Sequence, residues 1–380
     1  MVINGLYVTY EYSVKSKDVS SGIAKKIYAQ KECFEKIPAK IDFYNPYEEN
    51  MKRKFFRVCR RIPLYGYFNK IVSYIDFNKI DFVYIRKPWL MDADTLLWLR
   101  KIKKVNQKIK ILMEVPTYPY DYEMETISML PLLVKDKLYR GYLKEYVDRI
   151  ITYSNDDYIW GIKTIPISNG VNLDEEMIID SNKSMQDINI VAVSNLAFWH
   201  GYDRAINGLY NYYLEGGKEN IILHIVGTGK ELEKLIALTK KCNLCDNVVF
   251  YGRKNKTELM EIYKRCRIGL DSLGRHRSHV SFNSSLKSKE YLMKGLLIVS
   301  GVGNELDLEI DYPYYMRVSS NDTPIDFKKI LKFYHSIYDR SDEYEIRKEI
   351  ISFCKKKFSM DEVMKPVIDY IKCDLTVEQK

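Results

Sequence analysis

Short apolar runs alternate with longer amphipathic segments along the chain, and this alternation restricts the fold more than any other feature. In the first half, the apolar runs lie at residues 3–10, 39–44, 81–86, 110–115 and 148–154. In the second half, they lie at residues 188–194, 221–227, 247–252, 268–273, 295–301 and 312–318. Short runs separated by helical spacing are typical of βαβ units, so the sequence predicts an α/β protein with parallel sheets.

The 380 residues correspond to two domains at roughly 150 residues each, and a polar stretch that begins at Ile165 marks their division. We therefore expect a Rossmann-like domain over residues 1–167, a linker over 168–187 and a second Rossmann-like domain over 188–355. A C-terminal helical segment over 356–380 is expected to pack back toward the first domain. Doubly wound sheets bind ligands beyond the carboxyl ends of their strands, so function is expected in a central cleft that both domains face.

Composition restricts the environment and the partners of the chain. No run approaches the roughly 18 apolar residues of a membrane-spanning helix, and the first residues lack the basic start and apolar core of a signal peptide. The seven cysteines are scattered, which indicates reduced thiols and a cytoplasmic protein. A net charge of +9 favours anionic partners, such as phosphorylated ligands or an anionic membrane. No RNA-binding motif accompanies it, so nucleic acid is not expected.

A glycine turn follows the apolar run at 221–227. Gly227 and Gly229 stand between this predicted strand and a predicted helix, where the backbone can approach a phosphate at the helix N-terminus. The third glycine of the dinucleotide fingerprint would fall at Leu232, so NAD binding is not indicated. A purely structural turn remains the alternative.

The sequence SFNSSLKSKEYLMKG from Ser281 onward is a second candidate for anion binding. Ser284 and Ser285 can cap a helix, while Lys287 and Lys289 enter its first turn. Cations are unfavourable there unless an anion such as a diphosphate shares the site. Glu290 follows and can accept hydrogen bonds from sugar hydroxyls. An exposed, lysine-rich capped helix is the alternative.

The sequence SNLAFWHGYDRAI leaves a predicted strand through Asn195, His200 and Gly201. A histidine beside glycine at the start of a helix can donate to a phosphate. A histidine with only a structural role is an equally good interpretation.

Five motifs in this order resemble the C-terminal, nucleotide-sugar-binding half of GT-B glycosyltransferases, in particular the retaining family 4 and its group 1 relatives. They are IPISNGVN, WHGYDR, HIVGTGKELEKL, NVVFYGR and SSLKSKEYLMKGLLIVSG, and they cover about residues 165–301. The resemblance implies a GT-B fold, a nucleotide-sugar donor and transfer with retention. It also places Arg253, at the end of NVVFYGR, near the donor.

The resemblance assigns roles to particular residues. Glu290 matches the second glutamate of the family's Glu-x7-Glu pair, which binds the nucleotide ribose, and Ser285, Leu286 and Lys287 match positions near the diphosphate. The first glutamate, which handles the transferred sugar, is replaced by Phe282. Where the family carries Arg and Lys in its donor loop, this chain has Asn195 and His200. Phosphate neutralisation is therefore expected from Lys287 and His200.

The first half resembles the family less closely. SSGIAKKI occupies the place of a glycine-rich loop that faces the donor phosphates, with Gly22, Lys25 and Lys26 as candidate contacts. EVPTYPYDYE resembles the EIPTYPYD run of some bacterial polysaccharide glycosyltransferases. Relatives place a histidine in this loop, but the first histidine here is His200, so the candidate catalytic residues are Glu114, Thr117, Tyr118 and Asp121, besides His200. A proline-stiffened loop whose tyrosines pack the domain interface is the alternative.

No metal or cofactor is expected. Asp92 and Asp94 form a DxD, but they precede a predicted helix whose N-terminus they can cap. Cys242 and Cys245 form a CxxC without a second Cys or His pair at zinc spacing.

The sequence thus predicts transfer of a sugar from a nucleotide-sugar donor to a hydroxyl of a glycan or lipid-linked acceptor in surface polysaccharide synthesis. Lys287, His200 and the amides of the glycine turn would stabilise the diphosphate leaving group, and no protein nucleophile is required. Two alternatives remain open. One is a catalytically inactive subunit that pairs with an active partner, suggested by Phe282. The other is a nucleotide-sugar 2-epimerase, which shares the fold but uses N-domain histidine chemistry.

Residues 51–75 carry seven Lys or Arg and no acid, interleaved with aromatic side chains. This pattern indicates a segment that touches anionic lipid, each nearby cation contributing about 1 kcal/mol. A charged helix face over the core is the alternative.

Neutralising Arg57, Arg60 and Arg61 together should release the protein from anionic vesicles, and raised salt should do the same to the wild type. Vesicle co-sedimentation measures both effects, with neutral vesicles as the control. A wild-type protein that ignores anionic vesicles at low salt would show that the segment is only a solvated face.

Overall fold

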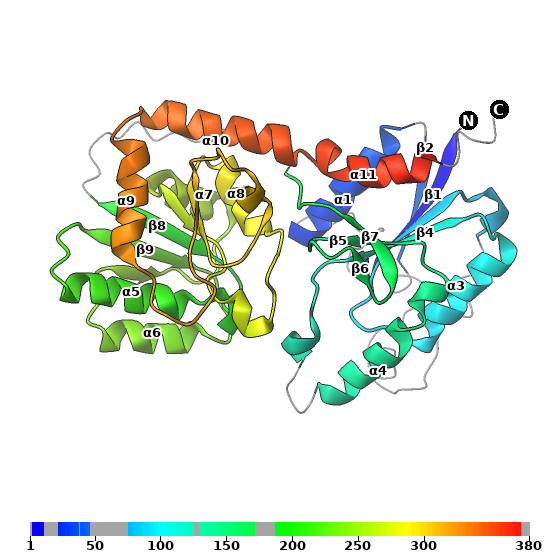
Figure 1. Cartoon of the computed structure of the whole chain (residues 1–380), viewed down its shortest axis with the longest axis horizontal. Helices are drawn as coiled ribbons and strands as arrows, with labels where there is room; N and C mark the ends of the chain where they lie inside the picture. The colour runs from blue at the N-terminus through cyan, green and yellow to red at the C-terminus, as the bar shows by residue number, and fades with distance from the viewer. Residues whose placement is uncertain are drawn as a thin grey trace. The chain divides into compact units, whose positions relative to one another are not determined.

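The computed structural model describes residues 2–10, 22–37, 39–45, 75–124, 129–171 and 187–373, which form two α/β units (Figure 1). Unit 1 runs to Ser168 and resumes at Met360, and unit 2 is Asn169–Ser359. Every apolar run named above contains a strand, so the α/β prediction is confirmed. The boundaries leave the whole of α10 (Glu343–Phe358) in unit 2 and α11 (Met360–Cys373) in unit 1.

Unit 1 contains a seven-stranded sheet with the order β2-β1-β3-β4-β5-β7-β6. The strands are β1 (Ile3–Val8), β2 (Ala39–Tyr44), β3 (Phe82–Arg86), β4 (Lys110–Val115), β5 (Arg149–Thr152), β6 (Tyr158–Ile159) and β7 (Ile162–Pro166). All neighbours are parallel except β6 and β7.

The β6–β7 hairpin is absent from the sequence prediction. Trp160 and Gly161 connect its strands with positive φ values of 51° and 79°, as two-residue hairpin turns require. Ile165 therefore lies in β7, which ends at Pro166, before the linker expected over residues 168–187. The strand adds a parallel edge to β5 before the chain leaves unit 1.

Helices cover both faces of the unit 1 sheet. On one face, Trp98, Leu99 and Ile102 of α3 (Ala93–Val105) pack against strand residues in a buried apolar cluster. On the other face, α1 (Gly22–Glu35) and α11 contribute a second cluster. Because helices cover both faces, the sheet is doubly wound. In such sheets, ligands bind beyond the carboxyl ends of the strands. A further helix, α4 (Leu130–Arg140), follows the loop after β4.

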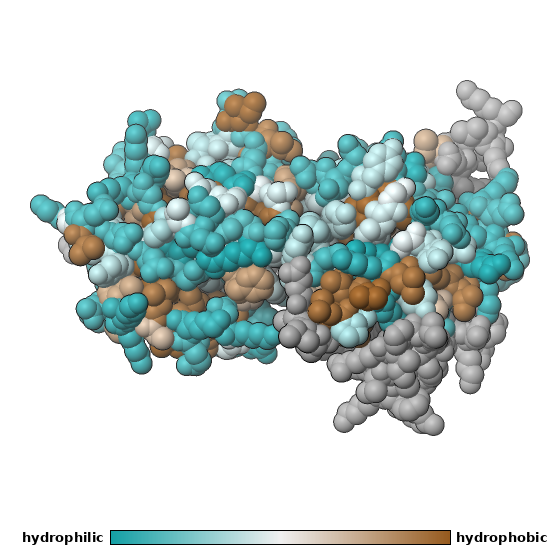
Figure 2. Space-filling view, turned by 60° about the horizontal axis from the view of Figure 1, so that its bottom comes forward, coloured by the Kyte–Doolittle hydropathy of each residue, from teal (hydrophilic) through white to brown (hydrophobic). Residues whose placement is uncertain are grey.

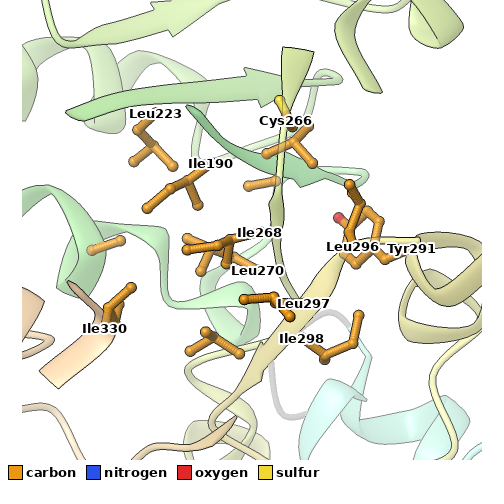
Figure 3. Packing of buried hydrophobic residues seen from close by; sticks show 14 of the residues in the cluster. Ile190, Leu223, Cys266, Ile268, Leu270, Tyr291, Leu296, Leu297, Ile298 and Ile330 are labelled. Carbon is orange, nitrogen blue, oxygen red and sulfur yellow. The ribbon is translucent and has the colours of Figure 1, made fainter. Parts of the chain in front are cut away.

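Unit 2 contains a six-stranded, all-parallel sheet with the order β10-β9-β8-β11-β12-β13. Its strands are β8 (Ile188–Val193), β9 (Ile221–Val226), β10 (Val248–Phe250), β11 (Ile268–Leu270), β12 (Leu297–Ser300) and β13 (Tyr315–Arg317). Its helices besides α10 are α5 (Tyr202–Leu214), α6 (Leu232–Lys241), α7 (Lys256–Arg265), α8 (Leu286–Met293) and α9 (Phe327–Tyr338). Figure 3 shows the core, where Ile190, Ile268 and Leu297 of adjacent strands lie among buried side chains.

A lysine of β4 joins α11 to unit 1. Lys110 is 8 % exposed, and its Nζ donates to the carbonyls of Tyr370 (2.7 Å) and Ile371 (3.1 Å) in the last turn of α11. A cation at a helix C-terminus also interacts favourably with the helix dipole. At the other end of α11, Asp361 pairs with Lys36 of the α1 C-terminal turn at 2.6 Å. The helix is thus held by charge at both ends and by apolar packing between them.

Replacing Lys110 with Met keeps the apolar stem but leaves one buried and one partly buried carbonyl without this donor. We expect the free energy of unfolding to fall by about 1.5 to 3 kcal/mol, the range for hydrogen bonds to a charged group. Urea denaturation measures this change, and hydrogen exchange should rise first in α11. The exposed Lys104 on α3 provides the control, since Lys104→Met should change the free energy of unfolding by less than about 0.5 kcal/mol. Equal stability of the two variants would refute this role of Lys110.

Candidate functional site in unit 2

The parallel strands of unit 2 bring several loops to one edge of the sheet. The loops after β8, β9, β11 and β12 all leave carboxyl ends, where doubly wound sheets bind ligands. Gly201 has a φ of 65°, and a Cβ there would lie 2.6 Å from the Gly274 backbone nitrogen. The loops after β8 and β11 can therefore approach closely only because this position is glycine.

The glycine turn after β9 serves packing. A Cβ on Gly227 would clash with the Ser194 carbonyl, and a Cβ on Gly229 would clash with the Leu196 carbonyl. The Gly227 N–H donates to the Gly252 carbonyl at 2.8 Å. The Gly227 amide is therefore not available to a phosphate, because it already has a partner within the fold, and a phosphate contact from Gly229 stays a prediction.

Lys287 in the first turn of α8 is the centre of the site. Its Nζ donates to Ser272 Oγ at 2.9 Å and lies 3.3 Å from Asp271 Oδ1. Its side chain is 18 % exposed. Burial lowers the pKa of Lys287 to about 8, with Asp271 opposing this shift and Arg275 adding to it. Lys287 is thus a partly buried cation at a helix N-terminus, which is an arrangement suited to an anionic ligand.

The neighbours of Lys287 in sequence behave differently from the prediction. Ser285 is the N-cap of α8, but its Oγ donates to Asp271 Oδ1 at 2.8 Å instead of capping the helix. Ser284 Oγ accepts from the Asn169 N–H at 2.8 Å, so this serine binds the first residue of unit 2 to the segment before α8. Lys289 is 1 % exposed and pairs with Glu305 at 2.7 Å, so it needs no ligand to balance its charge. Leu286 is exposed.

His200 lies in the same site but cannot supply charge. Its Nδ1 accepts the Ala197 N–H at 3.1 Å, and its ring stacks on Tyr202 with a centroid distance of 5.6 Å. Burial lowers its pKa to about 2, with Lys287 and Arg275 adding to the effect. The imidazole is therefore neutral with its proton on Nε2. The predicted neutralisation of phosphate by His200 is wrong, and one neutral hydrogen bond from Nε2 remains available to it.

The other donor-site candidates lie around this edge. Glu290 is half-buried, and its Oε1 accepts from Tyr263 OH at 2.9 Å. Phe282 forms an isolated parallel bridge with Gly303, after β12. Asn195 and Arg253 are exposed.

Sequence reasoning missed Asp271, Ser272, Tyr202 and Arg275. The run IGLDSL was assigned whole to a strand, but β11 ends at Leu270, so Asp271 and Ser272 already belong to the carboxyl-end loop. A strand followed at once by Asp-Ser is the signal that could have identified them.

Glu114 of unit 1 is not a catalytic carboxylate as predicted. It is fully buried, and its Oε2 accepts from Tyr84 OH (2.7 Å) and Gln30 Nε2 (3.0 Å). Burial alone would raise its pKa, but the ion pairs with Lys26 (3.4 Å) and Arg86 outweigh burial and lower the pKa to about 2. Because Lys26 neutralises Glu114, it is not the free donor-loop cation that was expected.

The loop after β4 keeps its other candidates nearer the surface. Asp121 pairs with Arg140 through two contacts of 2.6 and 2.8 Å, which together with Lys137 lower its pKa. Tyr118 packs edge-on against Trp160 at a centroid distance of 6.1 Å. Tyr118 thus packs within unit 1, and the interpretation that the tyrosines of this loop pack the domain interface stays a prediction. Asp121 is an ionised, paired carboxylate that is poorly suited to act as a base. Thr117 is half-buried.

The remaining candidates have simple local descriptions. Asp92 caps α3, accepting from the Thr95 N–H at 2.9 Å, as expected of this DxD, and Asp94 is buried. Within the described ranges, no three His, Cys, Asp or Glu side chains gather where they could hold a metal ion. Lys25 is exposed on α1, which begins at Gly22, and Cys242 and Cys245 are free thiols. Arg57, Arg60 and Arg61 lie outside the described residues.

Part of unit 2 matches a known protein family. Residues 174–270 match the family model described as glycosyl transferases group 1. No curated protein matches the chain by sequence.

Solved structures over nearly the whole chain share its fold. Sucrose-phosphate synthase from Thermosynechococcus elongatus has a TM-score of 0.64 at 12 % identity, covering 99 % of this chain and 100 % of its own. Anabaena HepE in complex with UDP and glucose has a TM-score of 0.58 at 11 % identity, covering 97 % and 99 %. The lipopolysaccharide outer core galactosyltransferase WaaB has 0.58 at 15 % identity, covering 98 % and 99 %. The GT-B fold predicted from the sequence is confirmed.

Proposed function

We propose that this chain, a group 1 glycosyltransferase with the GT-B fold, transfers a sugar from a UDP-sugar to a hydroxyl of a glycan or lipid-linked acceptor in surface polysaccharide synthesis. The observation that carries the proposal is Lys287, a partly buried cation in the first turn of α8 at the carboxyl edge of the unit 2 sheet. The choice of UDP is supported by Anabaena HepE, which was solved with UDP and with UDP-glucose.

In this proposal, unit 2 stabilises the leaving diphosphate. Negative charge develops on the phosphate oxygens as the glycosidic bond breaks, and a preorganised cation stabilises that charge most when water is excluded. Lys287 supplies the cation, the N-terminus of α8 supplies oriented amides, and His200 Nε2 supplies one neutral donor. None of these three groups requires a metal ion, so we expect turnover without added metal.

Glu290 is proposed to bind the nucleotide ribose. One of its oxygens accepts from Tyr263, which orients the carboxylate at the end of α8's first turn. The carboxylate can accept hydrogen bonds from the two ribose hydroxyls, and bonds to a charged acceptor are the stronger ones.

Transfer with retention is proposed from the family resemblance, by same-face attack in which the leaving phosphate assists deprotonation of the acceptor. The candidate carboxylates of unit 1 are both held in ion pairs, which agrees with a mechanism that lacks a protein nucleophile. Glu114 is buried and paired, and Asp121 is held by Arg140. Thr117 and Tyr118 are then proposed to contact the acceptor or the transferred sugar rather than to exchange protons.

Attachment to an anionic membrane surface is a further part of the proposal, with the inner face of the cytoplasmic membrane as the site. Leu130, Val134 and Leu138 are spaced by four residues on α4 and are 44, 66 and 52 % exposed, so they form an apolar stripe. Figure 2 shows hydrophobic residues gathered on the unit at the right of the view. Among the helices that the structure describes, none has the length and apolar composition to cross a bilayer.

An inactive subunit that pairs with an active partner is the second candidate, because Phe282 stands where the family has its sugar-handling glutamate. Turnover of UDP-sugars by the purified chain distinguishes the two, since an inactive subunit would bind UDP but release no sugar.

Replacing Lys287 or Glu290 with Gln should weaken UDP binding by about 1.5 to 3 kcal/mol, because each removes hydrogen bonds to a charged group. Isothermal titration calorimetry measures the affinity, and thermal unfolding checks that the fold persists. Lys240→Gln, at the exposed C-terminal turn of α6, is the matched control and should bind UDP normally. Unchanged affinity in a folded Lys287→Gln protein would remove the basis of the proposal.

A further inference from the structure

A buried carboxylate lies directly behind Lys287. Asp271 follows the last residue of β11 and is completely buried. Its Oδ1 accepts from Ser285 Oγ at 2.8 Å and lies 3.3 Å from Lys287 Nζ. Its Oδ2 is buried without a hydrogen-bond partner among the described residues. A buried carboxylate with an unsatisfied oxygen is costly, so it needs a compensating interaction with a nearby charge.

The backbone around Asp271 is fixed on several sides. Its N–H donates to the Val299 carbonyl at 2.9 Å, and the Gly301 N–H donates to the Ser272 carbonyl at 3.0 Å. Two residues further on, the Leu273 carbonyl accepts from Arg204, whose guanidinium also binds the carbonyls of Ser319 and Thr323. The carboxylate therefore cannot easily move away from Lys287.

The charges that face Lys287 come from several elements. Arg275 follows the β11 loop and lowers the pKa of Lys287, and His200 before α5 is neutral. The Tyr202 ring of α5 lies 5.8 Å from Lys287 Nζ. The positive end of α8 also opposes the ammonium. Among the described side chains, Asp271 is the one carboxylate within ion-pair distance of Lys287.

We propose that Asp271 is a positioning residue that keeps Lys287 charged and directed at the donor diphosphate, an inference that rests on the proposed function of this site. Lys287 and Arg275 carry two positive charges and Asp271 carries one negative charge, so one net positive charge remains. The carboxylate therefore keeps Lys287 protonated without cancelling the attraction for a diphosphate. Asp271 acts through Lys287 and need not touch the nucleotide.

The consequence is a pH dependence with a definite direction. With a pKa of about 8, Lys287 is mostly protonated at neutral pH, and UDP affinity should fall as the pH rises through 8. Removing a carboxylate this close to a cation changes the pKa by about 1 to 3 units, downward for an amine. In Asp271→Asn, the fall in affinity should therefore occur about 1 to 3 pH units lower than in the wild type.

Calorimetric titration with UDP between pH 6 and 9.5 tests the proposal. At pH 7.5 we expect Asp271→Asn to bind UDP about tenfold more weakly than the wild type, with proton uptake on binding, and the difference from the wild type should narrow as the pH falls toward 6. Protonation of UDP itself changes the affinity of both proteins equally, so it does not affect the difference between their pH profiles. Glu261→Gln removes a charge from the exposed face of α7 and should keep the wild-type profile.

If Asp271→Asn fails to fold, Ser285→Ala provides a second variant. It removes the hydrogen bond that orients Asp271 Oδ1, so it should move the profile in the same direction by a smaller amount. A weakening that is equal at all pH values would show a merely structural role and overturn the inference, as would an unshifted profile. A wild-type protein that does not bind UDP at any pH would instead overturn the proposed function.

Discussion

Placing a lysine ammonium in the first turn of a helix is unfavourable, because loss of water and the positive end of the helix both oppose the charge. The carboxyl edge of unit 2 is organised around this constraint. Asp271 and Ser272 lie beside Lys287 because β11 ends at Leu270, so both residues belong to the loop at its carboxyl end. The close approaches of Gly201 to Gly274 and of Gly301 to Leu273 bring their loop into place. The resulting cation is retained by the fold and remains able to attract an anion.

In unit 1, the buried charge of Glu114 is fully paired and is not available to a ligand. Lys26 and Arg86 both pair with Glu114, and Tyr84 and Gln30 satisfy its other oxygen. This set stabilises the sheet against α1 but leaves the carboxylate inaccessible to a substrate. We therefore propose that chemistry that depends on charge takes place in unit 2, and that Thr117, Tyr118 and the paired Asp121 of the loop after β4 serve for contacts with sugar or acceptor. Such a division suits a reaction in which the leaving group, and not a side chain, accepts the proton.

Much of the fold could be predicted from the sequence because parallel strands buried on both faces appear as continuous apolar runs. The β6–β7 hairpin could not, since β6 has only two residues and leaves no periodic pattern. The candidate side chains of unit 2 lie at the carboxyl edge of its sheet, where they were expected, but several of their charge states and partners differ from the prediction. Lys287 and Glu290 follow from motif and helix position. The charge states of His200 and Glu114, and the pairing of Lys289 with Glu305, depend on contacts between segments far apart in the chain. Residue spacing alone does not reveal such contacts. The basic segment at residues 51–75 remains a prediction.

Chemical labelling of lysines in the presence and absence of UDP tests the central claim most directly. An amine with a pKa near 8 is partly unprotonated at pH 8 and should acylate readily despite its partial burial. The account predicts that saturating UDP protects Lys287 from acylation, measured by mass spectrometry of the digested protein, while the exposed Lys240 labels as before. Equal labelling of Lys287 with and without bound UDP would show that the diphosphate binds elsewhere and would contradict the account.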